Sequence, residues 1–224
     1  MKNIIITGTS RGIGYELALK FAADHKVLAL SRKIPSALAA HPNITCLSVD
    51  LSVESDLEKV KNFLESDWKS VDAIIHNAGA MLLKPFRETT VADFEHIYKV
   101  NVFAVAALNR LAIDFLQPGS HVVTISSMGG VQGTMKFAGL AAYSSSKGAV
   151  ITLSELLAEE YRDQQISFNV LALGAVQTEM LAEAFPGYEA PVTPQEMADY
   201  IMNFTLTGHR FHNGKVIQVS STTP

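Results

Sequence analysis

Short runs of β-branched residues alternate with longer helical patterns along this 224-residue chain, and no other feature constrains its fold as strongly. The patterns predict strands at Asn3–Thr7, Val27–Leu30, Ile44–Val49, Val71–Ile75, His121–Ser126, Ile166–Ala172 and Lys215–Val219. They predict helices at Arg11–Ala23, Val53–Leu64, Phe94–Leu116, Tyr143–Arg162 and Pro194–Phe204. Because parallel strands need long crossover connections, this order favours an α/β fold in which helices cover both faces of a parallel sheet.

The number of domains is open from length alone, since a domain averages about 150 residues. The stretch Gly129–Ser146 is rich in Gly, Ala and Ser, as linkers are. A boundary there would leave neither part with a complete sheet. We therefore expect a loop inside one domain that spans residues 1–224.

Composition excludes several classes of function. The net charge of −4 argues against a large basic face for nucleic acid. No apolar run approaches the ~18 residues of a membrane helix, and the first residues lack the apolar core of a signal peptide. The single cysteine, Cys46, fits a reducing compartment, and His209 and His212 have no further ligands nearby in sequence for a metal ion. We expect a cytoplasmic protein without a metal, membrane or nucleic-acid partner.

A glycine-rich turn, Thr7–Gly14, joins the first predicted strand to the first helix. Glycines permit a tight turn, and the helix N-terminus offers free N–H groups to a pyrophosphate. The residues expected to contact a dinucleotide here are Gly8, Ser10, Arg11, Gly12, Ile13 and Gly14. The spacing differs from the usual Gly-x-Gly-x-x-Gly, so a turn without a ligand is the alternative.

The end of the second strand distinguishes NAD from NADP. A carboxylate there would bind the ribose 2′-hydroxyl, whereas a basic residue accommodates a 2′-phosphate. The chain has Ser31 and Arg32 at this point, and we expect Arg11, in the glycine turn, to reach the same phosphate. A guanidinium suits phosphate oxygens, so the sequence favours NADP over NAD, with a solvated basic turn as the alternative.

Tyr143 and Lys147 lie on one face of a predicted helix, four residues apart. A nearby ammonium would lower the pKa of the phenol and make it a general acid, although this spacing also occurs by chance. Asn101 is the polar member of an apolar stripe on the predicted helix Phe94–Leu116. A buried amide is costly without partners, so we expect Asn101 to have a specific one.

These motifs together resemble the short-chain dehydrogenase/reductase (SDR) family. The matches occur in the family's order: Thr7–Gly14, Asp50-Leu51, Asn77-Ala78-Gly79, Asn101, Ser126-Ser127, Tyr143-x-x-x-Lys147 and Gly174–Thr178. The resemblance implies a Rossmann-type doubly wound sheet of about seven parallel strands. It also implies an oxidoreductase that uses NADP(H) to reduce a ketone or aldehyde, or to oxidise the alcohol.

The resemblance assigns roles to individual residues. Tyr143 is the catalytic acid, Lys147 lowers its pKa and holds the nicotinamide ribose, and Ser127 binds the substrate carbonyl. Asn101 positions Lys147 through a water. The remaining cofactor contacts are Asp50 and Leu51 at the adenine, Asn77, Ala78 and Gly79 beside its ribose, and Val176 and Thr178 at the carboxamide.

The sequence also departs from the family pattern. His76 stands where a second asparagine is common, and Leu173 where a proline usually precedes Gly174. Only a short segment, about 178–205, remains to cover the substrate.

A second, largely apolar stripe lies on the predicted helix Phe94–Leu116, at Val102, Ala106, Asn109, Ile113 and Leu116. The stripe predicts a homodimer or homotetramer, unless another segment of the chain covers it.

The alternative to an NADP(H)-dependent oxidoreductase is a regulatory protein that binds the cofactor without catalysing a reaction.

Overall fold

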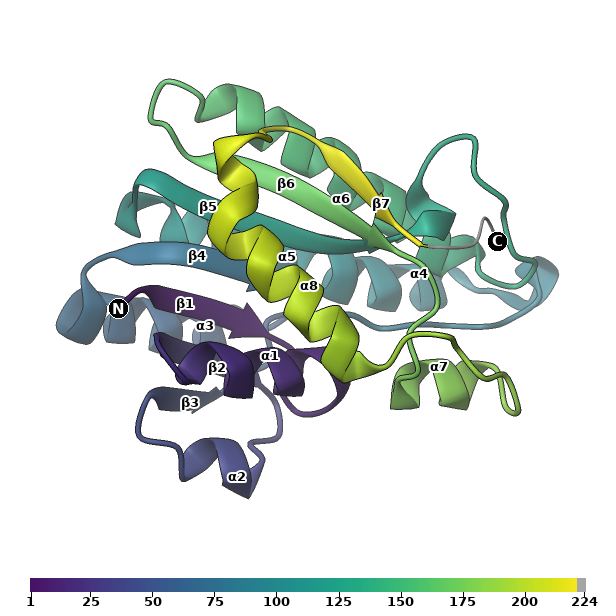
Figure 1. Ribbon diagram of the computed structural model, residues 1–224. Coiled ribbons are helices and arrows are strands. Elements are labelled where there is room, and N and C mark those ends of the chain that lie inside the picture. Colours follow the sequence, from purple (N-terminus) through teal and green to yellow (C-terminus); the bar gives the residue numbers. More distant parts are fainter. Residues whose placement is uncertain (221–224) are drawn as a thin grey trace.

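Seven parallel strands form one sheet in the computed structural model, which describes residues 1–220 (Figure 1). The strands are β1 (Asn3–Thr7), β2 (Lys26–Ser31), β3 (Ile44–Ser48), β4 (Val71–His76), β5 (Leu116–Ser127), β6 (Ser167–Leu173) and β7 (Val216–Val219). Their order is β3-β2-β1-β4-β5-β6-β7, and every neighbouring pair is parallel. The predicted α/β fold with a seven-stranded parallel sheet is confirmed. The order reverses between β1 and β4, which is where doubly wound sheets bind their ligands.

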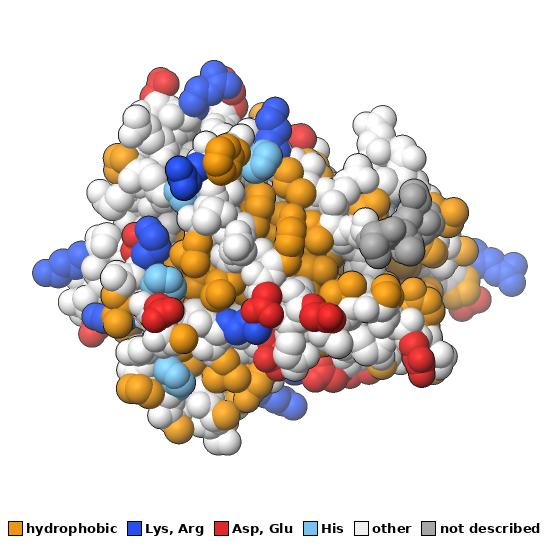
Figure 2. All heavy atoms as spheres, viewed as in Figure 1, with side chains coloured by type: hydrophobic (Ala, Val, Ile, Leu, Met, Phe, Trp, Pro, Cys, Tyr) orange, Lys and Arg blue, Asp and Glu red, His pale blue; other side chains and the backbone are white. Residues whose placement is uncertain are grey.

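Helices cover both faces of the sheet. They are α1 (Gly12–Ala22), α2 (Ser36–Ala39), α3 (Glu54–Phe63), α4 (Val91–Tyr98), α5 (Ala104–Ala112), α6 (Ala141–Glu160), α7 (Glu179–Ala184) and α8 (Pro194–Thr207). Ile4 and Ile6 of β1 pack with α1 and α8, whereas Ile5 packs with α3, α5 and α6. Because side chains alternate along a strand, the continuous apolar run of β1 supplies both cores. On the face seen in Figure 2, hydrophobic side chains also gather between α8 and β7.

The predicted long helix Phe94–Leu116 differs in the structure. It begins at Val91, because Thr90 and Asp93 form a capping box, and Leu116 already belongs to β5. A π-helical turn, Lys99–Phe103, separates α4 from α5. A π turn holds more residues per turn, so it shifts Val102 relative to the other four members of the predicted second stripe. The stripe is also not one outward face. Of its members, Asn109 and Leu116 are buried.

Residues 1–220 contain neither a membrane-spanning helix nor a cluster of metal ligands. No helix among them is both long and apolar enough to cross a membrane. They contain no cluster of three or more His, Cys, Asp or Glu side chains suited to a metal ion. His209 instead packs its ring against that of His121, with ring centres 5.4 Å apart.

Candidate active site

Tyr143 and Lys147 lie in the first two turns of α6, next to the end of β5. Lys147 Nζ donates to the carbonyl oxygen of Ile125 at 2.8 Å, and Ser126 Oγ donates to the carbonyl oxygen of Lys147 at 2.8 Å. A Cβ on Gly130 would lie only 2.6 Å from the Lys147 carbonyl carbon, so this approach requires glycine. The strand end and the helix therefore hold Ser127, Tyr143 and Lys147 in one place.

Burial sets the proton affinities of this group. It raises the pKa of Tyr143 to about 12, against a smaller lowering by a hydrogen bond with Ser127. It also lowers the pKa of Lys147 to about 8. The sequence led us to expect that Lys147 lowers the pKa of Tyr143, and in the structure burial is the larger effect on that pKa. The ammonium donates to Ile125 and lies 5.8 Å from the phenol ring centre, so removal from water dominates.

Asn101 lies in the π-helical turn and is buried, with the specific partners that its burial predicts. Its Oδ1 accepts from the Ala80 amide at 2.8 Å, and its Nδ2 donates to the Ala80 carbonyl and to Ser146 Oγ, each at 2.9 Å. Ser146 Oγ donates in turn to the Tyr143 carbonyl at 2.7 Å. Asn101 thus joins the chain after β4 to the first turn of α6. A π turn at such a position is a frequent feature of functional sites.

The glycine turn and the segment after β4 form one hydrogen-bonded unit. Thr7 Oγ1 accepts from the Asn77 and Ala78 amides at 3.0 and 2.9 Å, and Asn77 Nδ2 donates to the carbonyl oxygens of Thr7 and Gly8. A Cβ on Gly14 would lie 2.3 Å from the Gly8 carbonyl oxygen. Gly8 and Gly12 both have positive φ, 73° and 59°, so the turn needs glycine there as well.

One cavity of about 1460 Å³ connects these parts. Its lining includes the sequence-predicted residues Gly8, Ser10, Arg11, Gly12, Ile13, Ser31, Arg32, Asp50, Leu51, Asn77, Ala78, Gly79, Ser127, Tyr143, Lys147, Val176 and Thr178. Two predicted residues do not line it: Gly14 packs beneath the turn, and Asn101 is buried behind the wall.

A family model described as short chain dehydrogenase matches residues 2–189. The chain belongs to this family. 7alpha-hydroxysteroid dehydrogenase of Escherichia coli (strain K12) is 30% identical over 98% of this chain and 92% of its own length.

Solved structures agree with this assignment. The structure of ElxO with NADP bound has a TM-score of 0.84 at 26% identity and covers 98% of this chain and 97% of its own. The structure of 4-hydroxyisoleucine dehydrogenase complexed with NADH has a TM-score of 0.87 at 24% identity, over 98% and 97% of the two chains, and shows the shared fold.

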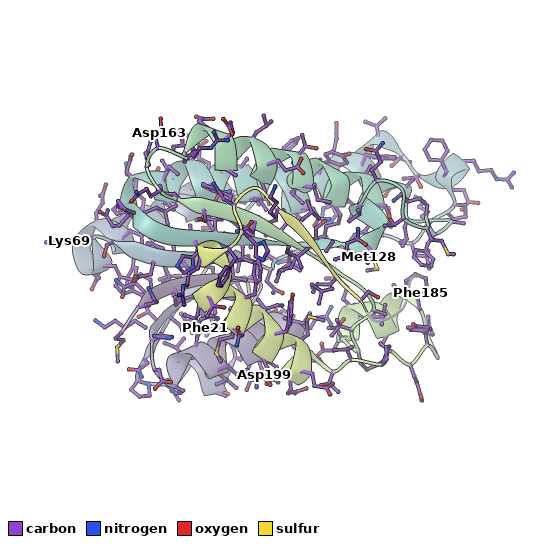
Figure 3. All side chains as sticks on the ribbon, turned by 45° about the horizontal axis from the view of Figure 1, so that its top comes forward. Phe21, Lys69, Met128, Asp163, Phe185 and Asp199 are labelled. Carbon is purple, nitrogen blue, oxygen red and sulfur yellow. The ribbon has the colours of Figure 1, made fainter. Side chains whose placement is uncertain are left out.

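This short-chain dehydrogenase has an apolar wall that sequence reasoning missed. It comes from three segments that adjoin Ser127 and Tyr143 in the cavity: Met81, Met128, Phe137, Leu140, Met180, Leu181, Phe185 and Tyr188. Met128, which follows β5, and Phe185, which follows α7, both line the cavity and are labelled in Figure 3. These segments lack helical or strand periodicity, so only their proximity to the family motifs would have indicated them. The exposed His96 also lines the cavity.

The segment predicted to cover the substrate, 178–205, divides into two parts. Thr178 caps α7 by accepting from the Leu181 amide at 3.2 Å, and Thr178 to Tyr188 contribute to the cavity wall. From Pro194 the chain forms α8, which packs on α1 instead.

Among the residues expected at the cofactor, Arg11 has a partner that the sequence did not predict. Its guanidinium forms a two-point ion pair with Glu183 of α7.

Proposed function

We propose that this dehydrogenase uses NADP(H) to reduce a ketone or aldehyde, or to oxidise the corresponding alcohol. The observation that carries the proposal is the single cavity in which Tyr143, Ser127 and Lys147 share a wall with the glycine turn. The NADP-bound ElxO is a relative of known structure. We also propose that residues 1–224 form one domain.

The cavity fits a dinucleotide together with a substrate. Its volume of about 1460 Å³ exceeds the ~300–1,000 Å³ of a pocket for one drug-sized ligand. Gly8 and Gly12 of the turn line the cavity, and a Cβ on Gly79 would lie 3.5 Å from both Asn101 Oδ1 and Lys147 Nζ. The glycine turn would hold the pyrophosphate, Asp50 and Leu51 the adenine, and Val176 and Thr178 the carboxamide. When bound, the cofactor supplies or accepts a hydride.

The preference for NADP rests on the end of β2. Ser31 is buried, and its Oγ donates to the Lys33 carbonyl at 2.7 Å and accepts from Thr9 Oγ1 at 3.3 Å. Arg32 follows it on the surface and lines the cavity, and no carboxylate stands at this strand end. A guanidinium there stabilises a phosphate dianion, whereas NAD would lack its usual acidic partner.

The protein residues orient the carbonyl and move one proton. Tyr143, neutral because burial raises its pKa to about 12, donates its hydroxyl proton to the carbonyl oxygen in the reductive direction. Ser127, hydrogen-bonded to Tyr143, orients that oxygen. Lys147 stabilises the phenolate that remains, and Asn101 holds the first turn of α6 through Ser146.

The substrate is a neutral, apolar carbonyl compound. The wall beyond Ser127 and Tyr143 is formed by Met, Leu, Phe and Tyr side chains, so burial of apolar surface supplies the binding energy. Apart from Lys147, the Lys and Arg side chains that line the cavity are Arg11, Arg32 and Lys33, which belong to the glycine turn and the end of β2. A substrate carboxylate or phosphate against the apolar wall would be desolvated without a partner.

NADPH oxidation across a panel of carbonyl compounds tests the proposal. Turnover with apolar ketones or aldehydes, absent in Tyr143→Phe, is the expected result. Tight NADPH binding without turnover of any carbonyl would favour the non-catalytic regulator instead.

We also propose a homo-oligomer, dimer or tetramer, built on α5 and α6. Phe103, which directly precedes α5, and Leu156 of α6 are 59% and 62% exposed, which is unusual for large apolar side chains on neighbouring helices.

A further inference from the structure

Helix α7 presents two carboxylates, one turn apart, to the glycine turn. Glu183 accepts from both terminal nitrogens of Arg11, with Arg11 Nη2 at 2.9 Å from Glu183 Oε2. Glu179 lies one turn earlier, and its Oε2 is 3.4 Å from the position that a Cβ on Gly12 would occupy. The glycine turn is the part of the fold that receives cofactor phosphates, so these carboxylates stand beside a site for other anions.

Arg11 is the cation that would pair with either anion, a carboxylate of α7 or a phosphate of the cofactor. It lines the main cavity, and also a smaller one of about 540 Å³ that Glu179 and Ala182 of α7 line as well. The hydrogen bond and charge of Glu183, with the charge of Glu179, hold the pKa of Arg11 above its usual value despite partial burial. Glu183 occupies the edge formed by Arg11 Nη1 and Nη2, so a phosphate can take that edge only by displacing the carboxylate. Arg11 therefore exchanges one anion for another.

We propose that Glu183 competes with the 2′-phosphate of the cofactor for Arg11, and that Glu183 thereby limits the preference for NADPH over NADH. The inference rests on the proposed function, because it assumes that the glycine turn binds these dinucleotides. NADH lacks the 2′-phosphate, so its binding leaves the Arg11–Glu183 pair in place. NADPH gains the Arg11 contact only by breaking that pair.

The size of the effect follows from the exposure of the pair. Arg11 is 48% and Glu183 62% exposed, and exposed ion pairs contribute little because water and salt screen them. Removal of the Glu183 charge should therefore tighten NADPH binding about two- to five-fold and leave NADH binding unchanged.

The contact also connects the cofactor end of the cavity to the substrate end. Met180 and Leu181 lie between the two glutamates in α7 and belong to the apolar wall. When Arg11 turns to the 2′-phosphate, α7 loses its ion pair to the glycine turn. The helix is then held by its Thr178 cap and by the packing of its apolar side chains.

Titration calorimetry of the whole protein with NADPH, NADH and 2′,5′-ADP tests the inference without using turnover. Glu183→Gln removes the charge and keeps the shape of the side chain. Glu189→Gln is the matched control, since Glu189 is an exposed carboxylate in the loop that follows α7. Arg11→Gln, alone and with Glu183→Gln, completes a double-mutant cycle.

We expect Glu183→Gln to tighten NADPH and 2′,5′-ADP about two- to five-fold, with NADH unchanged and Glu189→Gln without effect. In the Arg11→Gln background, Glu183→Gln should change nothing. An unchanged NADPH to NADH ratio in Glu183→Gln would overturn the competition and leave the proposed function intact. Failure of the unaltered protein to bind either dinucleotide would overturn the proposed function itself.

Discussion

His76 Nε2 donates a hydrogen bond to Asn109 Oδ1 across 2.8 Å, and both side chains are buried between β4 and α5. The pair explains two features of the sequence together: the histidine in place of the family's asparagine, and the polar residue in the predicted second stripe. Burial lowers the pKa of His76 to about 4, so the ring is neutral at pH 7.

We predict that the free energy of unfolding decreases as the pH is lowered from about 6.5 to 4, in part because of His76. A histidine in the unfolded chain has a pKa near 6.5, so in this pH range it binds a proton, whereas His76 in the native protein stays neutral. The stabilisation is complete above pH 6.5 and is lost as the pH falls toward 4, at a cost on the order of 3 kcal/mol for a shift of this size. Denaturant unfolding of His76→Asn at several pH values should give a flatter pH profile than the unaltered protein.

His96→Asn, the same substitution at an exposed histidine, is the matched control for this prediction. His121 should contribute separately to the acid sensitivity. Burial lowers its pKa to about 4, and protonation would point an N–H at Asn169 Nδ2, which already donates to it at 3.0 Å. Parallel pH profiles for His76→Asn and the unaltered protein would contradict a neutral buried His76.

Tyr143→Phe should lower turnover by about 10²- to 10⁴-fold, the usual contribution of a positioned general acid. NADPH affinity should stay within a few-fold, because the phenyl ring keeps its packing in α6. Steady-state rates and an equilibrium titration on the same preparation separate the two effects. A rate within a few-fold of the unaltered protein would exclude Tyr143 as the proton donor.

Lys147→Ala should reduce both turnover and NADPH affinity, unlike Tyr143→Phe. The ammonium is proposed to hold the nicotinamide ribose and to stabilise the phenolate, and its loss also removes a donor from the carbonyl of the buried Ile125. The two variants should therefore differ mainly in the NADPH dissociation constant. Unimpaired NADPH binding by Lys147→Ala would remove Lys147 from the cofactor site.

The sequence predicted the sheet well because each strand is a continuous apolar run, as in Ile4, Ile5 and Ile6, which supply both cores. It predicted less well where structure depends on distant parts of the chain. The π-helical turn Lys99–Phe103 has no periodic signal, and α2 and α7 are too short to show one.

The same limit applies to the active site. Most of the motif residues line one cavity, since the motifs follow strands that lie next to each other in the sheet. The Arg11–Glu183 pair joins residues 172 positions apart, and nothing local marks Glu183. The shifts in the pKa of Tyr143 and Lys147 depend on burial, which only the packed structure reveals.

Ser31→Asp combined with Arg32→Ser should shift cofactor preference toward NADH by at least about tenfold. The new carboxylate would accept from the ribose 2′-hydroxyl and repel a 2′-phosphate, and the phosphate would lose a charge-assisted contact worth about 1.5–3 kcal/mol. The ratio of kcat/KM for the two cofactors measures the shift. Equal use of NADPH and NADH by the unaltered protein would contradict the preference itself.

The last prediction concerns assembly through α5 and α6. The exposed Phe103 and Leu156 offer apolar surface on neighbouring elements, and a two-fold axis would bring each patch against its own copy. We therefore expect light scattering at micromolar concentration to give a multiple of 24.3 kDa. Phe103→Glu or Leu156→Glu should shift that mass to the monomer, because each places a charge without a partner in the apolar interface. Asn62→Glu adds the same charge to an exposed position on α3 and should leave the assembly intact. A mass of 24.3 kDa for the unaltered protein would refute the oligomer, and an oligomer that survives both substitutions would place the interface on another face.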